Sequence, residues 1–132
     1  MPKINKLSGN RFEMSFTSKL GSQGFWVHNF QQNFAGQPVD IIACRNGKVY
    51  LIDCKVCENG VFRFDRIEVN QLGAMRMFAK RFGQSKSGWF ALLYDSKIYM
   101  LSLDEVEEWQ TKRNNGVAVT NCVPYERWVE NA

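Results

Sequence analysis

Apolar side chains recur at helical spacing near the start of the chain. Residues 11–20 predict a helix, because Ser8 or Asn10 can cap its start and Gly21 can end it. The apolar stripe of this helix consists of Phe12, Phe16 and Leu20. Such a stripe predicts that one side of the helix packs against a core.

Two further helices are predicted in the second half of the chain. One begins at Asp65 or Arg66 and continues to about Phe82. Its predicted buried stripe is Leu72, Met75, Ala79 and Phe82. The other opens at residues 102–105, whose serine and glutamate form a capping box, and extends to about Lys112.

Strands are predicted from alternation and from continuous apolar runs. Residues 25–34 alternate aromatic and polar side chains and predict a strand, with a loop at 35–37. A short strand is expected at 61–64. Residues 88–94 form a continuous apolar run, typical of a central buried strand, and a further strand is expected at 98–101.

The predicted order of elements is α-β-β-β-α-β-β-α, once the hairpin discussed below is included. A mixed α/β architecture, in which helices flank one β-sheet, suits this order. The C-terminal residues 117–128 are compatible with either an edge strand or a short helix. The chain has 132 residues, 45% of them apolar, so residues 1–132 are expected to form a single domain with its own core.

Residues 38–55 carry the most informative pattern in the sequence. Asn46-Gly47 lies between two apolar runs and predicts a tight hairpin, because both turn positions need positive φ. A two-residue turn there places Asp40 directly opposite Asp53 on one face of the sheet. Lys55 is two residues beyond Asp53, so its side chain points to the same face.

Two facing carboxylates repel each other, and a divalent cation removes that cost. Mg²⁺ prefers oxygen ligands, so Asp40 and Asp53 are predicted to bind Mg²⁺, with Mn²⁺ as a substitute. Lys55 beside them is suited to orient or deprotonate a water, or to stabilise a phosphate. The sequence therefore predicts metal-dependent phosphodiester chemistry. The alternative is a pair of solvated acids, with Lys55 in an ordinary salt bridge.

Composition adds little to this picture. Aromatic residues make up 14% of the chain, which argues against disorder, and the net charge of +4 is compatible with a nucleic-acid partner. No apolar run reaches the length of a signal core or a membrane span, so a cytoplasmic location is expected.

Cys54 and Cys57 would point to opposite faces of a strand, and the only histidine is His28. Free thiols are therefore favoured over structural zinc.

The arrangement resembles the PD-(D/E)XK nuclease superfamily. A helix with an acid, a strand, Pro38-Val39-Asp40, Asp53-Cys54-Lys55 and a further helix occur here in that superfamily's order. Residues 9–13 and Asn70-Gln71 are similar to small Holliday-junction resolvases. The strands at 89–94 and 98–101, together with Trp109, are similar to the resolvases of Gram-positive bacteria and their phages. The resemblance covers roughly residues 8–110 and implies a restriction-endonuclease-like fold.

The resemblance also implies functional roles. Glu13 would join the metal site, the backbone carbonyl near Cys54 would be a ligand, and Gln71 would bind the scissile phosphate or water. The substrate would be a four-way DNA junction, and paired cuts need two sites, so a homodimer with C₂ symmetry is expected. If the gene belongs to a phage, the location is the host cytoplasm. The candidate phosphate contacts are Arg11, Lys19, Arg76, Lys80, Arg81 and Lys86.

Two departures and several alternatives accompany this interpretation. The second acid is Asp53 where Glu is more frequent, and the short chain leaves little room for a DNA-inserting stalk, which bears on junction specificity. The same fold can serve a nuclease for flaps, ends or specific sites, or a non-catalytic DNA-binding module. A protein-binding regulator is a third class. Phe62 and Phe64, on either side of Arg63, are candidates for contact with nucleic acid.

Overall fold

The computed structural model describes residues 2–30 and 39–132, with side chains of the first segment described from residue 9 onward. Its centre is a six-stranded sheet in the order β1-β2-β3-β5-β6-β8. The strands are β1 Trp26–Asn29, β2 Ile41–Arg45, β3 Lys48–Val56, β5 Gly88–Tyr94, β6 Lys97–Ser102 and β8 Val123–Pro124. Strands β3 and β5 run parallel, and the other neighbouring pairs of this sheet are antiparallel. The predicted mixed sheet is therefore confirmed.

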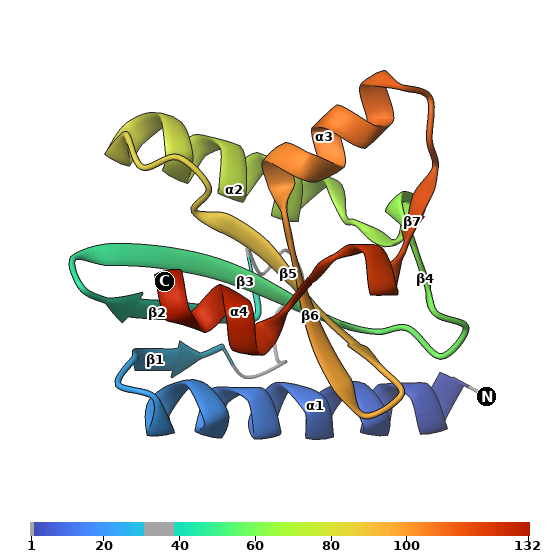
Figure 1. The fold of residues 1–132 in the computed structure, drawn as a ribbon, viewed down its shortest axis with the longest axis horizontal. Coiled ribbons are helices and arrows are strands. Elements are labelled where there is room, and N and C mark those ends of the chain that lie inside the picture. Colours follow the sequence, from blue (N-terminus) through green and yellow to red (C-terminus); the bar gives the residue numbers. More distant parts are fainter. Residues whose placement is uncertain (1, 31–38) are drawn as a thin grey trace.

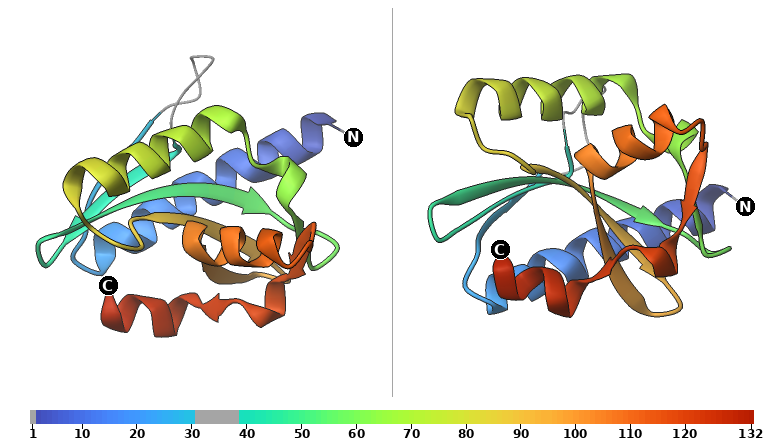
Figure 2. Two further views of the ribbon diagram at one scale, coloured as in Figure 1. Left: turned by 90° about the horizontal axis from the view of Figure 1, so that it is seen from above. Right: turned by 45° about the horizontal axis from the view of Figure 1, so that its top comes forward.

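Helices cover both faces of the sheet (Figures 1 and 2). They are α1 Pro2–Ser22, α2 Val69–Phe82, α3 Leu103–Thr111 and α4 Tyr125–Asn131. Helices α1 and α4 lie on one face, and α2 and α3 lie on the other. A small second sheet pairs β4, Val61–Arg63, with β7, Gly116–Ala118, and 3-10 turns occupy Phe64–Arg66 and Val119–Asn121.

Alternate residues of the strands divide the interior into two core clusters. The first core cluster, under α1 and α4, includes Phe12, Phe16, Leu20, Ile52, Trp89, Tyr125 and Trp128. The second core cluster, under α2 and α3, includes Leu51, Phe62, Phe64, Met75, Phe90 and Val106. Because successive side chains of a strand point to opposite faces, β3 contributes Ile52 to one cluster and Leu51 to the other.

The first helix is longer than predicted. Helix α1 already begins at Pro2, so Ser8 and Asn10 lie inside it and do not cap its start. Proline fits the first helical turn, and no further proline interrupts this stretch. The chain leaves the helix after Ser22, one residue beyond the predicted stop, and Gly24 supplies the positive φ of 87° in the turn.

The second predicted helix begins later than expected. Residues Phe64–Arg66 form a 3-10 turn, Ile67 is extended, and α2 starts at Val69. Burial of Phe64 and Ile67 in the second core cluster holds this entry segment away from the helix axis. Phe62 and Phe64 are therefore core residues, and the predicted contact between them and nucleic acid is wrong.

The end of α2 is confirmed, but its predicted buried stripe is wrong in one position. Gly83 follows the helix with a φ of 65° and ends it. Phe82 is 71% exposed. Phe78, one turn earlier, packs against the second core cluster and stacks on Phe82 at a centroid distance of 4.5 Å. The last turn of α2 therefore extends beyond the core.

The remaining elements follow the predictions with local adjustments. The tail forms both an edge strand, β8, and a helix, α4. The first strand ends at Asn29, whereas the predicted continuation to residue 34 and the loop at 35–37 lie outside the described residues. A capping box opens α3 as predicted. No helix among the described residues is long and apolar enough to cross a bilayer.

Candidate active site

The hairpin register agrees with the one predicted from the sequence. Strand β2 pairs with β3 from the turn as far as the Ile41–Ile52 pair. The ladder ends there. Asp40, the residue before β2, donates its N–H to the Ile52 carbonyl over 3.2 Å, but Ile52 is already the partner of Ile41, so this bond lies one residue out of the hairpin register. Asp40 therefore lies close to Asp53 just beyond the end of the antiparallel ladder, and its place directly opposite Asp53 stays a prediction.

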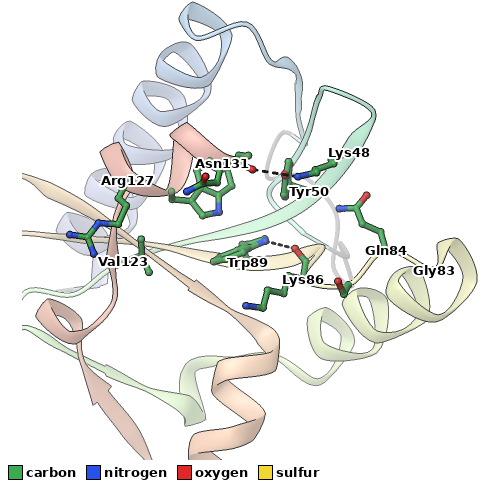
Figure 3. A pocket seen from close by; sticks show the side chains of 12 residues that line it. Lys48, Tyr50, Gly83, Gln84, Lys86, Trp89, Val123, Arg127 and Asn131 are labelled. Atoms are coloured by element: carbon green, nitrogen blue, oxygen red, sulfur yellow. Dashed lines mark hydrogen bonds between the residues drawn. The ribbon is translucent and has the colours of Figure 1, made fainter.

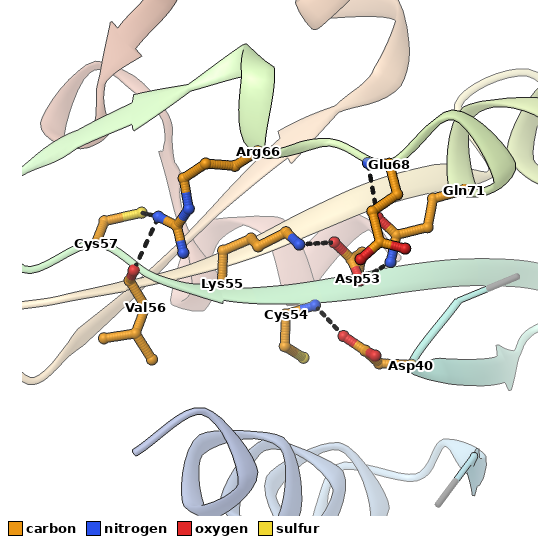
Figure 4. Close-up of polar contacts among 9 residues, drawn as sticks. All are labelled: Asp40, Asp53, Cys54, Lys55, Val56, Cys57, Arg66, Glu68 and Gln71. Atoms are coloured by element: carbon orange, nitrogen blue, oxygen red, sulfur yellow. Dashed lines mark hydrogen bonds and ion pairs between the residues drawn. The ribbon is translucent and has the colours of Figure 1, made fainter. Parts of the chain in front are cut away.

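Asp53 is a deeply buried carboxylate with two polar neighbours (Figure 4). Its side chain is 1% exposed. Gln71, from the first turn of α2, donates from Nε2 to Oδ1 at 2.8 Å. Lys55 Nζ lies 3.2 Å from Oδ2, an ion pair in which the lysine side chain is 15% exposed. Among the described residues, no donor forms a well-oriented hydrogen bond to the buried Oδ2 atom.

Asp40 is held against the backbone of β3. Its Oδ2 atom accepts a hydrogen bond from the Cys54 N–H at 2.8 Å. The N–H and C=O of one strand residue point to the same side of the strand, so the Cys54 carbonyl faces the Asp40 side as well. Three oxygen-bearing groups, from Asp40, Asp53 and Cys54, thus converge where β2 separates from β3.

The electrostatics of this place disfavour a second negative charge. Burial raises the pKa of Asp53 well above its usual value, and the nearby Asp40 carboxylate raises it further, while Lys55 opposes both effects. The thiol pKa of Cys54 is raised for the same reasons, by burial first and then by the charges of Asp40, Asp53 and Glu13. Lys55 therefore supplies too little positive charge to balance both aspartates of this site.

The charge deficit predicts an unusual pH dependence of stability. Because the pKa of Asp53 is raised on folding, its stabilising contribution is complete below about pH 3.9 and is lost as pH rises through the higher folded-state pKa. In EDTA at pH 7, Asp53→Asn should therefore raise the melting temperature by roughly 3–6 °C, equivalent to about 1 kcal/mol. This difference should shrink toward pH 4.

Thermal unfolding followed by circular dichroism between pH 4 and pH 8 checks this prediction. Asp65→Asn is the matched control, because Asp65 is 64% exposed. The control should change the melting temperature little at any pH. An Asp53→Asn protein that melts at or below the temperature of the unmodified protein at pH 7 would contradict the prediction.

The residues present fit a divalent cation. Mg²⁺ is commonly bound by one or two carboxylates together with substrate phosphates, rather than by a complete protein cage. The chain offers the Asp40 and Asp53 carboxylates and the Cys54 carbonyl, and it leaves Asp53 Oδ2 buried without an oriented donor. In the part of the chain that the structure describes, no three His, Cys, Asp or Glu side chains form a complete metal-binding group. Any metal ion here would therefore need ligands from water or substrate.

Glu13 lies on the other side of the sheet from Asp53. It is a buried residue of α1, 8% exposed, and its charge acts on Cys54, whose side chain points toward α1. The structure thus brings Glu13 near β3 without grouping it with both aspartates. Its predicted part in the metal site stays a prediction.

The predicted phosphate contacts are spread over several places on the molecule. Arg76 forms a salt bridge with Glu107 at 2.8 Å. Lys19 lies over the Tyr125 ring at 5.2 Å from its centroid, and Arg11 is exposed on α1. Lys80 lies with Arg76 and Arg81 on the outer face of α2. Lys86 lines a separate pocket, together with Lys48 and Arg127.

A second pocket lies away from the acids (Figure 3). It has a volume of about 660 Å³ at the opposite end of β3, between Lys48, Lys86 and Arg127. None of the acids or amides predicted for the metal site lines it. We locate the candidate active site at the acids, since carboxylates are the ligands that Mg²⁺ is commonly bound by.

A smaller cleft adjoins the acids. It has a volume of about 420 Å³ and is lined by Gly9, Cys54, Lys55, Val56, Glu58 and Arg66. Arg66 was not predicted as a site residue, because the sequence placed it at a helix start. No local signal distinguishes it there, since its position depends on the 3-10 turn.

The chain also resembles known proteins. A family model described as archaeal Holliday junction resolvase (Hjc) matches residues 4–128. Among solved structures, Archaeoglobus fulgidus Hjc, a Holliday junction resolvase from an archaeal hyperthermophile, superimposes with a TM-score of 0.66 at 18% identity. The alignment covers 92% of this chain and 97% of that one. No curated protein matches the sequence. The narrower likeness to resolvases of Gram-positive bacteria and phages stays a prediction.

Proposed function

This chain belongs to the archaeal Holliday junction resolvase family, a Holliday-junction-resolving group of nucleases within the PD-(D/E)XK superfamily, and we propose that Asp40, Asp53 and Lys55 form its active site. One observation carries this proposal. Asp53 is almost completely buried, faces a second carboxylate, and has a lysine amine 3.2 Å away. Such an arrangement is costly for stability and useful for binding a cation beside a phosphate.

We propose Mg²⁺ as the cation, with Mn²⁺ as a substitute. Asp40, Asp53 and the Cys54 carbonyl would hold it, and the Cys54 N–H keeps the Asp40 carboxylate in place through a 2.8 Å hydrogen bond. When bound, the cation supplies charge that stabilises a phosphodiester under in-line attack by water. Glu13 would contribute through a bridging water, because it lies on the α1 side of β3.

Lys55 provides the second positive charge. Its amine is anchored to Asp53 Oδ2 and reaches the cleft from the same face of β3. From there it would orient the attacking water, hold the proton that this water loses, or stabilise charge on the phosphate oxygens. Because the ion pair with Asp53 already fixes the position of the Lys55 amine, the lysine side chain loses little freedom when DNA binds.

We propose a positioning role for Gln71 beside its predicted contact with the scissile phosphate or water. Its amide donates to Asp53 Oδ1 at 2.8 Å, and its Oε1 accepts from the Glu68 N–H at 3.3 Å. The side chain is 6% exposed. We propose that Gln71 acts through Asp53, by holding one carboxylate oxygen so that the other points to the cation.

Paired cuts in a four-way junction require two such sites. We propose a homodimer with C₂ symmetry, in which each subunit cuts one strand of the junction. A second candidate, a nuclease of the same fold that acts on flaps or ends, shares all residues named above. Only substrate assays separate the two.

Cleavage of labelled DNA tests the proposal. A synthetic four-way junction, a linear duplex and a flap would each be incubated with Mg²⁺, with Mn²⁺ and with EDTA. We expect paired symmetric cuts in the junction with either metal and none in EDTA. Cleavage of the duplex or flap instead would favour the second candidate, and metal-independent or absent cleavage despite binding would reject the metal-dependent site.

A further inference from the structure

The cleft beside the acids has a second end, which the proposed metal site does not use. Beyond the Ile41–Ile52 pair, β2 no longer pairs with β3 in the described residues. The cleft of about 420 Å³ lies along the next part of β3, at Cys54, Lys55 and Val56. Its walls also include Gly9 from α1 and Arg66 from the 3-10 turn.

Arg66 is fixed at this second end by the backbone of β3 (Figure 4). Its Nη1 donates to the Val56 carbonyl at 3.0 Å and lies 3.7 Å from Cys57 Sγ. These contacts use a single nitrogen of the guanidinium. Arginine carries five N–H donors in a planar fork, so most of its donors stay available. The backbone contact holds the charge in place before any ligand arrives.

The charge of Arg66 is also uncommitted. Within the described residues it forms no salt bridge, whereas Arg63 pairs with Asp65 and Arg76 pairs with Glu107. The side chain is exposed on the cleft side of the turn. One acid, Glu58, lines the same cleft, so the cleft holds two cationic side chains, Lys55 and Arg66, against one acid.

The spacing along β3 suggests what Arg66 binds. The Cys54 and Val56 backbone groups are two residues apart on one strand edge, which corresponds to about 6.6 Å. Asp40 bonds at Cys54, and Arg66 bonds at Val56. A separation of this size is comparable to that between successive phosphates of a DNA strand. A planar guanidinium is also well matched to two phosphate oxygens at once.

We propose that Arg66 binds the DNA phosphate next to the one that is cut. The cleft then contacts one strand at two consecutive phosphates, one at the acids and Lys55 and the next at Arg66. This inference rests on the proposed function, because it takes the acids as the place of cleavage. In this arrangement Arg66 binds the substrate and helps to determine where the strand is cut, while the acids and Lys55 carry out the chemical step.

Affinity for a four-way junction in EDTA provides a readout that is independent of cleavage. Arg66→Gln should weaken binding about tenfold, because a charge-assisted hydrogen bond is lost while an amide donor for Val56 is kept. The slope of log affinity against log salt should fall by about 0.9, the loss of one phosphate contact. Arg63→Gln is the matched control, an exposed arginine three residues away that is already paired with Asp65. It should change both quantities little.

Chemically modified DNA makes the test specific. Junctions would carry one uncharged methylphosphonate at the phosphate on either side of the mapped cut. For the unmodified protein, one of the two substitutions should weaken binding about tenfold, and for Arg66→Gln that same substitution should have no further effect. Thermal unfolding of each variant confirms that it is folded.

The outcomes separate this inference from the proposed function. Two outcomes would overturn the role of Arg66 without affecting the proposed function, provided that the unmodified protein cleaves DNA. One is that Arg66→Gln and Arg63→Gln change affinity equally. The other is that the methylphosphonate still weakens binding by the Arg66→Gln protein. Absence of metal-dependent cleavage by the unmodified protein would overturn the proposed function itself. Loss of folding in Arg66→Gln is resolved with Arg66→Lys, which keeps the charge and should lose less affinity.

Discussion

Asp53→Asn is expected to slow cleavage of a four-way junction by at least about 10³-fold in saturating Mg²⁺. The loss of a metal ligand removes several kcal/mol of transition-state stabilisation, and about 4 kcal/mol corresponds to a 10³-fold change in rate. The substitution keeps the shape of the side chain. In the unmodified protein Gln71 Nε2 donates to Asp53 Oδ1, and the amide oxygen of the introduced asparagine can accept the same hydrogen bond. The fold should therefore persist, and single-turnover cleavage rates measure the effect.

Binding distinguishes a chemical defect from a general one. Asp53→Asn removes a negative charge next to the phosphate site, so affinity for the junction in EDTA should stay unchanged or increase. Asp65→Asn, at an exposed carboxylate on the 3-10 turn, should keep both activity and affinity. A variant that still cleaves within tenfold of the normal rate would remove Asp53 from the proposed site.

Lys55→Ala should have the second-largest effect, a loss of about 10²–10³-fold in the cleavage rate. A positioned charge of this kind contributes roughly 3–4 kcal/mol to a transition state in which negative charge develops. Lys48→Ala is the matched control, because Lys48 lies on the same strand but at its opposite, exposed end. Single-turnover rates over a range of pH, at saturating Mg²⁺, measure the effect.

The two substitutions should not be additive. Lys55 and Asp53 form one ion pair of 3.2 Å and would act on the same phosphate. The double variant Asp53→Asn, Lys55→Ala should therefore be little slower than Asp53→Asn alone. Full additivity of the two losses would mean that the residues act independently, which the proposed arrangement excludes.

Features that depend on local chemistry were predicted correctly from the sequence. Asn46 and Gly47 adopt φ values of 54° and 75°, so the turn has the geometry that fixes the register of β2 against β3 as far as the Ile41–Ile52 pair. Ser102 and Glu105 cap α3 as expected. The apolar run of residues 88–94 is the central strand β5. Each of these depends on residues that are close together in the chain.

The failures concern packing between distant segments. Phe78 and Phe82 are both compatible with one apolar stripe, and only the extent of the second core cluster decides which of them is buried. The start of α2 is displaced because Phe64 and Ile67 pack into that cluster before the helix begins. Local propensity cannot report on these contacts.

The contrast between local chemistry and long-range packing also explains which candidate site residues the sequence could bring together. Asp53 and Lys55 belong to one strand, so alternation alone brings them to one face, and the tight turn of the hairpin brings Asp40 close to them. Gln71 was identified by resemblance, but its bond to Asp53 depends on how α2 lies over β3. Arg66 reaches Val56 only because a 3-10 turn carries it across ten residues of chain. Its place in the cleft required the structure.

The first core cluster joins α1 to α4, two helices far apart in the sequence, and this bears on when the protein can fold during synthesis. Tyr125 bonds to Gln23 across 102 residues, and Arg45 bonds to Ala132 across 87. Such contacts close large loops, which costs entropy and slows folding. The β2–β3 hairpin can form early because its strands are adjacent in sequence, whereas the core beneath it stays incomplete until α4 has left the ribosome. A ribosome-bound chain thus already carries the acidic pair, but the support on the α1 side of β3 is completed only when α4 has been translated.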